Sequence, residues 1–214
     1  MKTIFIIGNI ASGKSAAARH LEARGARRID LDELALSLYQ PGTRLVREIA
    51  EEFGEDVLDG EGGLIREALA RRAFASPADI ERLNALVHPI LRGRLADMLV
   101  PGVGCAASLP AAPCTVVEVS APRGFEDAFG LADAVVAIAA PLEVRRERAL
   151  ARGMAPADFD RRAAVQPTEE ELATLADVVI DNTAAADDLF TELDRVAAGL
   201  GIDLGPDRTG GPRG

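Results

Sequence analysis

The chain alternates short runs of apolar residues with longer segments in which apolar positions recur every three or four residues. Short apolar, β-branched runs are typical of strands buried in a parallel sheet, whereas the longer spacing predicts amphipathic helices. The predicted strands are 4–7, 27–32, 115–119, 134–138 and 178–180. Because helical segments separate them, we expect an α/β fold with a five-stranded parallel sheet and right-handed crossovers.

The region between the second and third strands carries helical patterns and no strand signal over residues 40–100. Within 46–53, apolar residues recur at positions i, i+3, i+4 and i+7, as on one face of a helix. A later helix should stop at His88, because Pro89 disfavours helical geometry at the residue before it, and a further helix should span 90–99. We therefore expect a helical insertion at this point.

The first strand runs into a glycine-rich segment, residues 8–15, that fits the pattern G-x-x-x-x-G-K-[ST]. In this pattern backbone N–H groups and a helix N-terminus bind a polyphosphate. A helix predicted over 15–24 follows and stops at Gly25. Only Lys14 and Lys2 are lysines among 24 basic residues, and a compact ammonium suits phosphate oxygens better than a planar guanidinium. The predicted nucleotide-binding residues are Gly8, Asn9, Ile10, Ala11, Ser12, Gly13, Lys14, Ser15 and Ala16.

Two further groups of charged residues suit a phosphate or metal site. Strand alternation places Asp30 and Asp32 on one side of the second strand with Leu31 opposite, at the sheet edge that the glycine loop also occupies. One of these acids could instead cap the next helix. Residues 143–162 hold six arginines against four acids, which suits an anion in a chain this acidic. Solvated i,i+4 pairs are the alternative.

Composition narrows the classes of function. A net charge of −10 and a pI near 4.8 argue against a general nucleic-acid or anionic-membrane surface. Cys105 and Cys114, with no zinc-like spacing, predict reduced thiols, and a disulfide between them is the alternative. Without a signal-peptide or membrane-spanning pattern we expect a cytoplasmic protein, either a monomer or a small homo-oligomer. Residues 201–214 are rich in glycine and proline and predict a disordered tail.

Many nucleotide-binding families share the glycine loop, but further motifs resemble those of the dephospho-CoA kinase family. They are Asp30-Leu31-Asp32, Asp59-Gly60 with Leu64-Ile65-Arg66, the segment 83–89 that ends in His88-Pro89, and Ala176 to Asn182. Arg148, Arg152, Arg162 and Gln166 also match. The resemblance covers residues 4 to about 195.

The resemblance implies an ATP- and Mg²⁺-dependent kinase that phosphorylates the ribose 3′-hydroxyl of dephospho-CoA, the last step of coenzyme A biosynthesis. It implies a P-loop fold with a helical insertion and a lid. The P-loop core would comprise 1–39, 115–140 and 170–200, the CoA-binding insertion 40–100, and the arginine-rich lid 141–165. The alternatives are another P-loop kinase for a small molecule or nucleotide, and a non-catalytic ATP-binding relative.

The resemblance also implies roles for residues at the reacting groups. Lys14 would neutralise the β- and γ-phosphate oxygens, and the Ser15 hydroxyl would ligate Mg²⁺. Asp30 would bind a water on that metal ion. Asp32 would orient the acceptor hydroxyl and take its proton.

Other residues would bind the two substrates. Arg148 and Arg152, on the lid, would close over the phosphates and offset developing charge. Arg66 and His88 would bind the phosphate or ribose of the acceptor. Asn182 would flank the adenine of ATP.

The chain departs from the family pattern in three places. Segment 119–126 has Pro122 and Glu126 but lacks the paired leucines of the usual P-L-L-[FV]-E run. No aspartate ends the third strand, so an ordinary Walker-B magnesium ligand is not expected. Ala11 and Ala16 stand where the family more often has Gly and Thr, and Ala11 is suited to the loop if its φ is negative.

Overall fold

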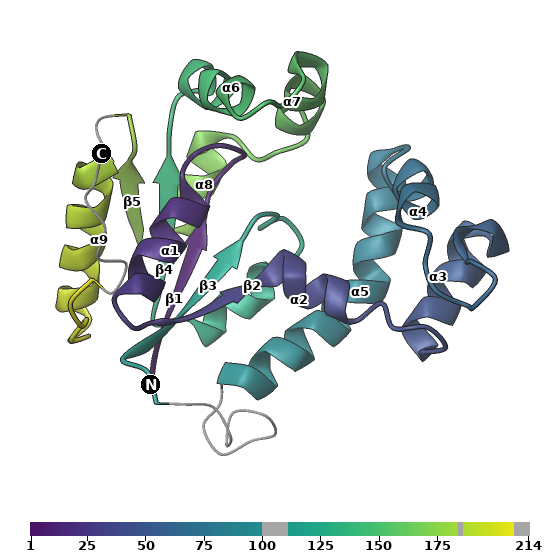
Figure 1. Ribbon diagram of the computed structural model, residues 1–214, viewed down its shortest axis with the longest axis horizontal. Helices are drawn as coiled ribbons and strands as arrows, with labels where there is room; N and C mark the ends of the chain where they lie inside the picture. The colour runs from purple at the N-terminus through teal and green to yellow at the C-terminus, as the bar shows by residue number, and fades with distance from the viewer. Residues whose placement is uncertain (100–110, 184–185, 208–214) are drawn as a thin grey trace. The chain divides into compact units, whose positions relative to one another are not determined.

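A computed structural model describes residues 1–99, 111–183 and 186–207. Its five strands form one sheet in the order β2-β3-β1-β4-β5, which confirms the predicted α/β class (Figure 1). The strands are β1 Lys2–Ile7, β2 Arg27–Asp30, β3 Cys114–Val119, β4 Ala134–Ala139 and β5 Val178–Asp181. The helices are α1 Lys14–Ala23, α2 Leu31–Ser37, α3 Arg44–Phe53, α4 Arg66–Ala73, α5 Pro77–Leu99, α6 Leu142–Ala151, α7 Pro156–Ala163, α8 Glu169–Leu175 and α9 Ala186–Gly199. Short 3₁₀ helices span Glu55–Val57 and Glu126–Leu131.

All paired strands are parallel, and β1 lies at the centre between β3 and β4. At its carboxyl end Ile7 lies opposite Val119 on one side and Ala137 on the other. Ligands of open parallel sheets bind beyond the carboxyl ends of the strands. The glycine-rich segment that follows Ile7 therefore starts at the centre of that edge.

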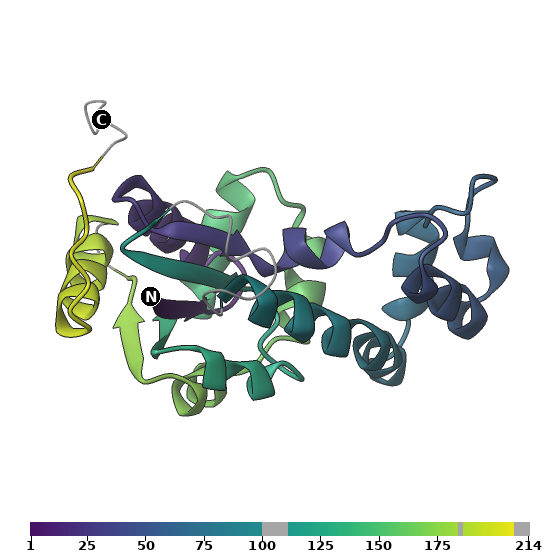
Figure 2. The same ribbon diagram turned by 90° about the horizontal axis from the view of Figure 1, so that it is seen from below.

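The sheet is covered on both faces by apolar side chains. On one face Ile4 and Ile6 of β1 pack in a cluster with Leu21 of α1 and Leu193 of α9. Helix α9 lies beside β5 in both views (Figures 1 and 2). On the other face the ring of Phe5 packs edge-on against Phe129, with ring centroids 5.9 Å apart. These two layers fix the position of the central strand and of the loop that follows it.

The chain divides into two compact units, one of Met1–Leu31 and Ser108–Gly214 and the other of Asp32–Ala107. The expectation that Asp30 and Asp32 share one face of a strand is wrong. Strand β2 ends at Asp30 and α2 begins at Leu31, so Asp32 lies in the first turn of a helix. A carboxylate there is stabilised by the N-terminal end of the helix dipole. This position agrees with the alternative that one of the two acids serves the start of the next helix.

The second unit contains one long helix where two were predicted. Helix α5 runs without interruption from Pro77 to Leu99, so the break predicted at His88 is wrong. Pro89 removes a single backbone donor, while the buried stripe of the helix continues on both sides of it. That stripe consists of Leu83, Val87, Leu91, Leu95 and Leu99. A proline inside a helix costs about 3 kcal/mol or more, while burying Leu91, Leu95 and Leu99 beyond it contributes about 1.5–3 kcal/mol each, which together outweighs that cost.

The C-terminal segment is ordered as far as it is described, so the disordered tail predicted from residue 201 is wrong for 201–207. Ile202 is buried, and the Gly205 N–H donates to the Arg24 carbonyl at 3.0 Å. The Arg24 Nε donates back to the Gly205 carbonyl at 2.9 Å. Residues 208–214 of the predicted tail lie outside the described residues.

Cys114 is a buried free thiol in β3, and burial raises its pKa to about 11. Cys105 lies outside the described residues. No helix in the described part of the chain is long and apolar enough to span a bilayer.

Candidate nucleotide-binding site

The glycine loop, residues 8–15, joins the end of β1 to the start of α1, as predicted. Gly8 has a φ of +152° and Gly13 a φ of +113°, in the region that favours glycine. A Cβ on Gly8 would lie 2.6 Å from the Ile138 carbonyl oxygen, so the loop has no room for a side chain there. The first N–H groups of α1 lack partners within the helix and face an incoming anion.

Ala11 has a φ of +59°, so the condition of a negative φ, under which alanine would suit this position, is not met. It is the one non-glycine residue in the described chain with a positive φ. The left-handed conformation costs an L-residue about 1–2 kcal/mol. The curvature of the loop is imposed on Ala11 by its neighbours Ile10 and Ser12, which are held by Gln166 and Asn182.

Asn182, predicted to contact the nucleotide, lies directly against the glycine loop. Its side chain is buried, and its Nδ2 donates to the Ser12 carbonyl oxygen at 2.7 Å. Asn182 follows β5, so the end of an outer strand helps to fix the loop after the central one.

Residues after α7 hold the opposite side of the loop. The Ile10 N–H donates to Gln166 Oε1 at 2.9 Å, and Asn9 Nδ2 donates to the Pro167 carbonyl at 2.9 Å. Asn9 is buried. The sequence motifs singled out Gln166 but not its role, because a contact across 156 residues leaves no local pattern.

A buried acid, Glu118, contacts the serine of the loop. The Ser15 hydroxyl donates to Glu118 Oε1, and the Arg28 guanidinium donates to Glu118 Oε2 at 2.7 Å and to Asp30 Oδ2 at 2.8 Å. Glu118 was not predicted, because the sequence analysis considered only an aspartate at the end of the strand as a magnesium ligand and found none. The available signal was one charged residue inside an otherwise uncharged strand of six.

Two of the six arginines in the predicted cluster form exposed ion pairs with acids of the same segment. Arg146 pairs with Asp160 at 3.2 Å, and Arg161 pairs with Asp158 at 2.6 Å. These exposed pairs fit the alternative of a solvated helix surface.

Arg145 points inward, although sequence gave no reason to separate it from its neighbours. Its side chain is buried, and its Nη2 lies 3.5 Å from Glu169 Oε1. Burial lowers the pKa of Arg145, and the nearby Glu169 carboxylate offsets only part of that shift.

Two of the predicted arginines have a different environment. Arg148 and Arg152 form no ion pair with any described residue. The Arg148 Nη1 is buried without a hydrogen-bond partner within that part of the chain, and a guanidinium in this environment suits an anionic ligand. Arg152 lines a cavity of about 280 Å³ together with Ile10 and Ala11 of the glycine loop. The structure therefore brings Arg152 to the loop.

Three predicted residues lie in the second unit. Asp32 is exposed in the first turn of α2, and Arg66 is exposed at the first position of α4. His88 is partly buried near the middle of α5.

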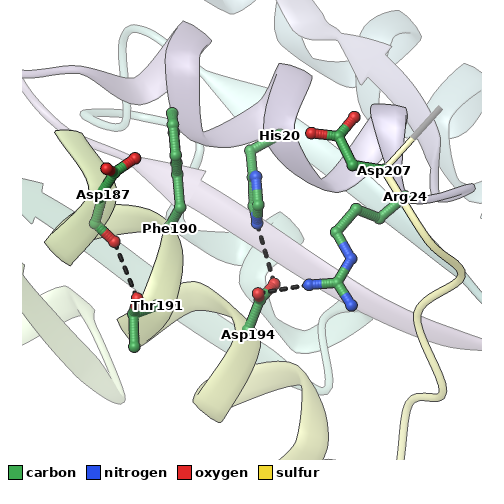
Figure 3. A pocket seen from close by; sticks show the side chains of 7 residues that line it. All are labelled: His20, Arg24, Asp187, Phe190, Thr191, Asp194 and Asp207. Atoms are coloured by element: carbon green, nitrogen blue, oxygen red, sulfur yellow. Dashed lines mark hydrogen bonds and ion pairs between the residues drawn. The ribbon is translucent and has the colours of Figure 1, made fainter. Parts of the chain in front are cut away.

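A larger cavity, of about 480 Å³, lies between α1 and α9 (Figure 3). The His20 ring stacks on Phe190 with centroids 4.5 Å apart, and His20 Nε2 lies 2.9 Å from Asp194 Oδ1. Arg24 pairs with the same carboxylate. Because these groups satisfy one another, we assign them to holding α9 on α1.

The parallel sheet and the glycine loop after its central strand define a P-loop kinase fold. A shikimate kinase from Acinetobacter baumannii shares this fold with a TM-score of 0.53 at 15% identity, over 95% of this chain and 96% of that one. A solved protein from Thermus thermophilus matches with a TM-score of 0.73 at 34% identity, over 93% and 97% of the two chains.

The family model for dephospho-CoA kinase matches residues 2–188. A dephospho-CoA kinase from Anaeromyxobacter dehalogenans is 39% identical over 202 residues, which are 94% of this chain and 92% of that protein. Another, from Corynebacterium diphtheriae, is 37% identical over 189 residues, 87% and 91% of the two chains. The chain belongs to the dephospho-CoA kinase family, which confirms the predicted family and kinase class.

Proposed function

We propose that this protein transfers the γ-phosphoryl group of ATP to the ribose 3′-hydroxyl of dephospho-CoA and so forms coenzyme A. The observation that carries the proposal is the contact of Ser15 with buried Glu118 at the head of a glycine loop, within a chain of this family. A loop, a hydroxyl and a carboxylate at one point are the parts that a donor site for MgATP requires.

The glycine loop would bind the phosphates of ATP. Backbone N–H groups from Ala11 to Ser15 would hold the β-phosphate, and Gly8 to Ala16 would surround it. The Lys14 side chain is buried, with Nζ 3.4 Å from the Asn9 carbonyl oxygen. Its ammonium therefore lies within the curve of the loop, where β- and γ-oxygens would replace that weak contact. Asn182 would act here by fixing the loop beside the adenine.

The Ser15 hydroxyl and the Glu118 carboxylate fit a magnesium ion shared with ATP. The described residues contain no cluster of three or more His, Cys, Asp or Glu side chains that could hold a metal ion. Mg²⁺ prefers one or two protein oxygens and completes its octahedron with phosphates and water. The ion would neutralise charge on the β- and γ-oxygens. Asp30, beside Glu118, would bind water on the ion.

The acceptor would be oriented by residues outside the glycine loop. Asp32 would orient the 3′-hydroxyl and accept its proton, and Arg66 and His88 would bind the acceptor's phosphate or ribose. Arg148 and Arg152 would stabilise charge on the transferred phosphoryl group. Removing either arginine should slow turnover by up to ~10³-fold, as for arginine fingers. In the same proposal, residues 141–165 would form the lid and residues 40–100 would bind the acceptor. The protein would act in the cytoplasm.

The direct experiment supplies ATP, Mg²⁺ and dephospho-CoA and measures coenzyme A by mass spectrometry, beside a panel of nucleosides and shikimate. Asp32→Asn should lower kcat by about 10²-fold or more, because it removes the proton acceptor. Glu33→Gln changes a neighbouring exposed acid in the same turn and should retain activity. Preference for another acceptor would support a different P-loop kinase, and ATP binding without turnover would support a non-catalytic relative.

A further inference from the structure

Two carboxylates lie side by side at the carboxyl edge of the sheet. In the parallel register of β2 and β3, Asp30 is directly opposite Glu118. Like charges in directly opposed positions destabilise a sheet. One guanidinium lies between them, since Arg28 Nη2 donates to an oxygen of each.

This triad is largely removed from water. The exposed fractions of the side chains are 18% for Arg28, 18% for Asp30 and 4% for Glu118. Burial lowers the pKa of Arg28, but Glu118, then Asp30 and Glu22, raise it by more, so the net shift is upward. The guanidinium is a fixed positive charge, and its loss would leave two carboxylates facing each other at low exposure.

The two oxygens of Glu118 have different partners. Oε1 accepts the Ser15 hydroxyl and Oε2 accepts Arg28. Glutamate has one more side-chain torsion than aspartate, so a glutamate at this place needs a second contact to hold one orientation. Arg28 supplies that contact from the neighbouring strand.

We propose that Arg28 is a positioning residue for the metal side of the donor site, holding Glu118 in the orientation that meets Ser15 and the incoming magnesium. The proposal rests on the proposed binding of MgATP. It assigns Arg28 no contact with substrate: Arg28 acts only through Glu118 and Asp30. Its loss should therefore weaken the response to Mg²⁺ and leave binding of metal-free ATP nearly unchanged.

The test measures ATP binding by titration calorimetry over a series of Mg²⁺ concentrations. Arg28→Leu should raise the Mg²⁺ concentration for half-maximal tightening about tenfold, the equivalent of one buried hydrogen bond to a charged group. ATP affinity in EDTA should stay within twofold. Arg27→Leu is the matched control on the same strand, where the guanidinium donates to Thr115 Oγ1 at 2.8 Å, and should keep the wild-type midpoint.

Two further variants keep the test decisive if Arg28→Leu does not fold. Arg28→Lys retains the charge but not the planar fork, and should raise the midpoint about threefold. In a Glu118→Gln background, Arg28→Lys should add no further shift, because the residue to be positioned has lost its charge. A midpoint within twofold of wild type for the folded variant, or an equal loss of ATP affinity in EDTA, would overturn the proposal. Because the test measures ATP binding and uses no acceptor, its outcome does not depend on whether dephospho-CoA is the acceptor.

Discussion

The amide of Asn182 lies across Gly13 of the glycine loop. Its Nδ2 donates to the Ser12 carbonyl at 2.7 Å and would stand 2.3 Å from any Cβ at position 13. A strand-end side chain and a glycine without a side chain are therefore matched to each other, and the match fixes the loop before any nucleotide binds.

Gly13→Ala should disrupt this contact and weaken ATP binding by at least tenfold. The variant combines a φ of +113° with displacement of Asn182. Gly42→Ala is the control for strain alone, because Gly42 has a φ of +76° and open space around it. Calorimetry should show unchanged ATP affinity for Gly42→Ala, and equal affinities for both variants would contradict the role given to Asn182.

Ala11→Gly should stabilise the protein by up to about 1 kcal/mol. Glycine relieves a strain of about 1–2 kcal/mol at φ +59° but loses more chain entropy on folding. The matched change Ala16→Gly lies in the first turn of α1, where glycine should cost up to about 1 kcal/mol. Urea unfolding should therefore give opposite signs for two identical substitutions five positions apart. A loss of stability at both sites would contradict the strained loop.

Asp194→Ala should destabilise the protein by about 1–3 kcal/mol without changing kcat. The carboxylate joins α9 to His20 of α1 and to Arg24 directly after it, and its loss leaves a partly buried guanidinium without its charge partner (Figure 3). Glu192→Ala removes an exposed i,i+3 pair with Arg195 and should cost under about 0.5 kcal/mol. Thermal unfolding of the two variants measures the difference. A large loss of kcat in Asp194→Ala would instead place the α1–α9 cavity in the reaction.

Cys114 should resist alkylation in the native protein at pH 8. Burial raises its pKa to about 11 from an ordinary value of 9.0, so almost no thiolate is present. Since the folded-state pKa is the higher one, the thiol's contribution to stability is complete below pH 9 and is lost as the pH rises towards 11. Peptide mapping after iodoacetamide treatment should find Cys114 labelled only in urea; rapid native labelling would contradict its burial.

The sequence was sufficient for the sheet and the loop because both depend on local signals. An apolar strand, a glycine-rich turn and a lysine at fixed spacing determine where residues 4–15 go. The same holds for α3, whose apolar spacing and N-cap at Thr43 are both local.

The differences arose where a tertiary contact overrides a local preference. Pro89 stays helical because leucines on both sides of it are buried. Ala11 takes a positive φ because the loop is held at Ser12 and Ile10 by residues more than 150 positions away. Glu118 was not predicted as a site residue because its role depends on contact with Ser15, and only the fold brings these two residues together.

The central claim is that the γ-phosphoryl group of ATP moves to the 3′-hydroxyl of dephospho-CoA. The most direct measurement supplies ATP whose γ-phosphate carries heavy oxygen, with Mg²⁺ and dephospho-CoA, and locates the label by mass spectrometry. The account predicts one labelled phosphate on the 3′-oxygen of coenzyme A for each ADP formed, and a loss of that product in Asp32→Asn. ADP released with label only in inorganic phosphate, or on another acceptor, would contradict it.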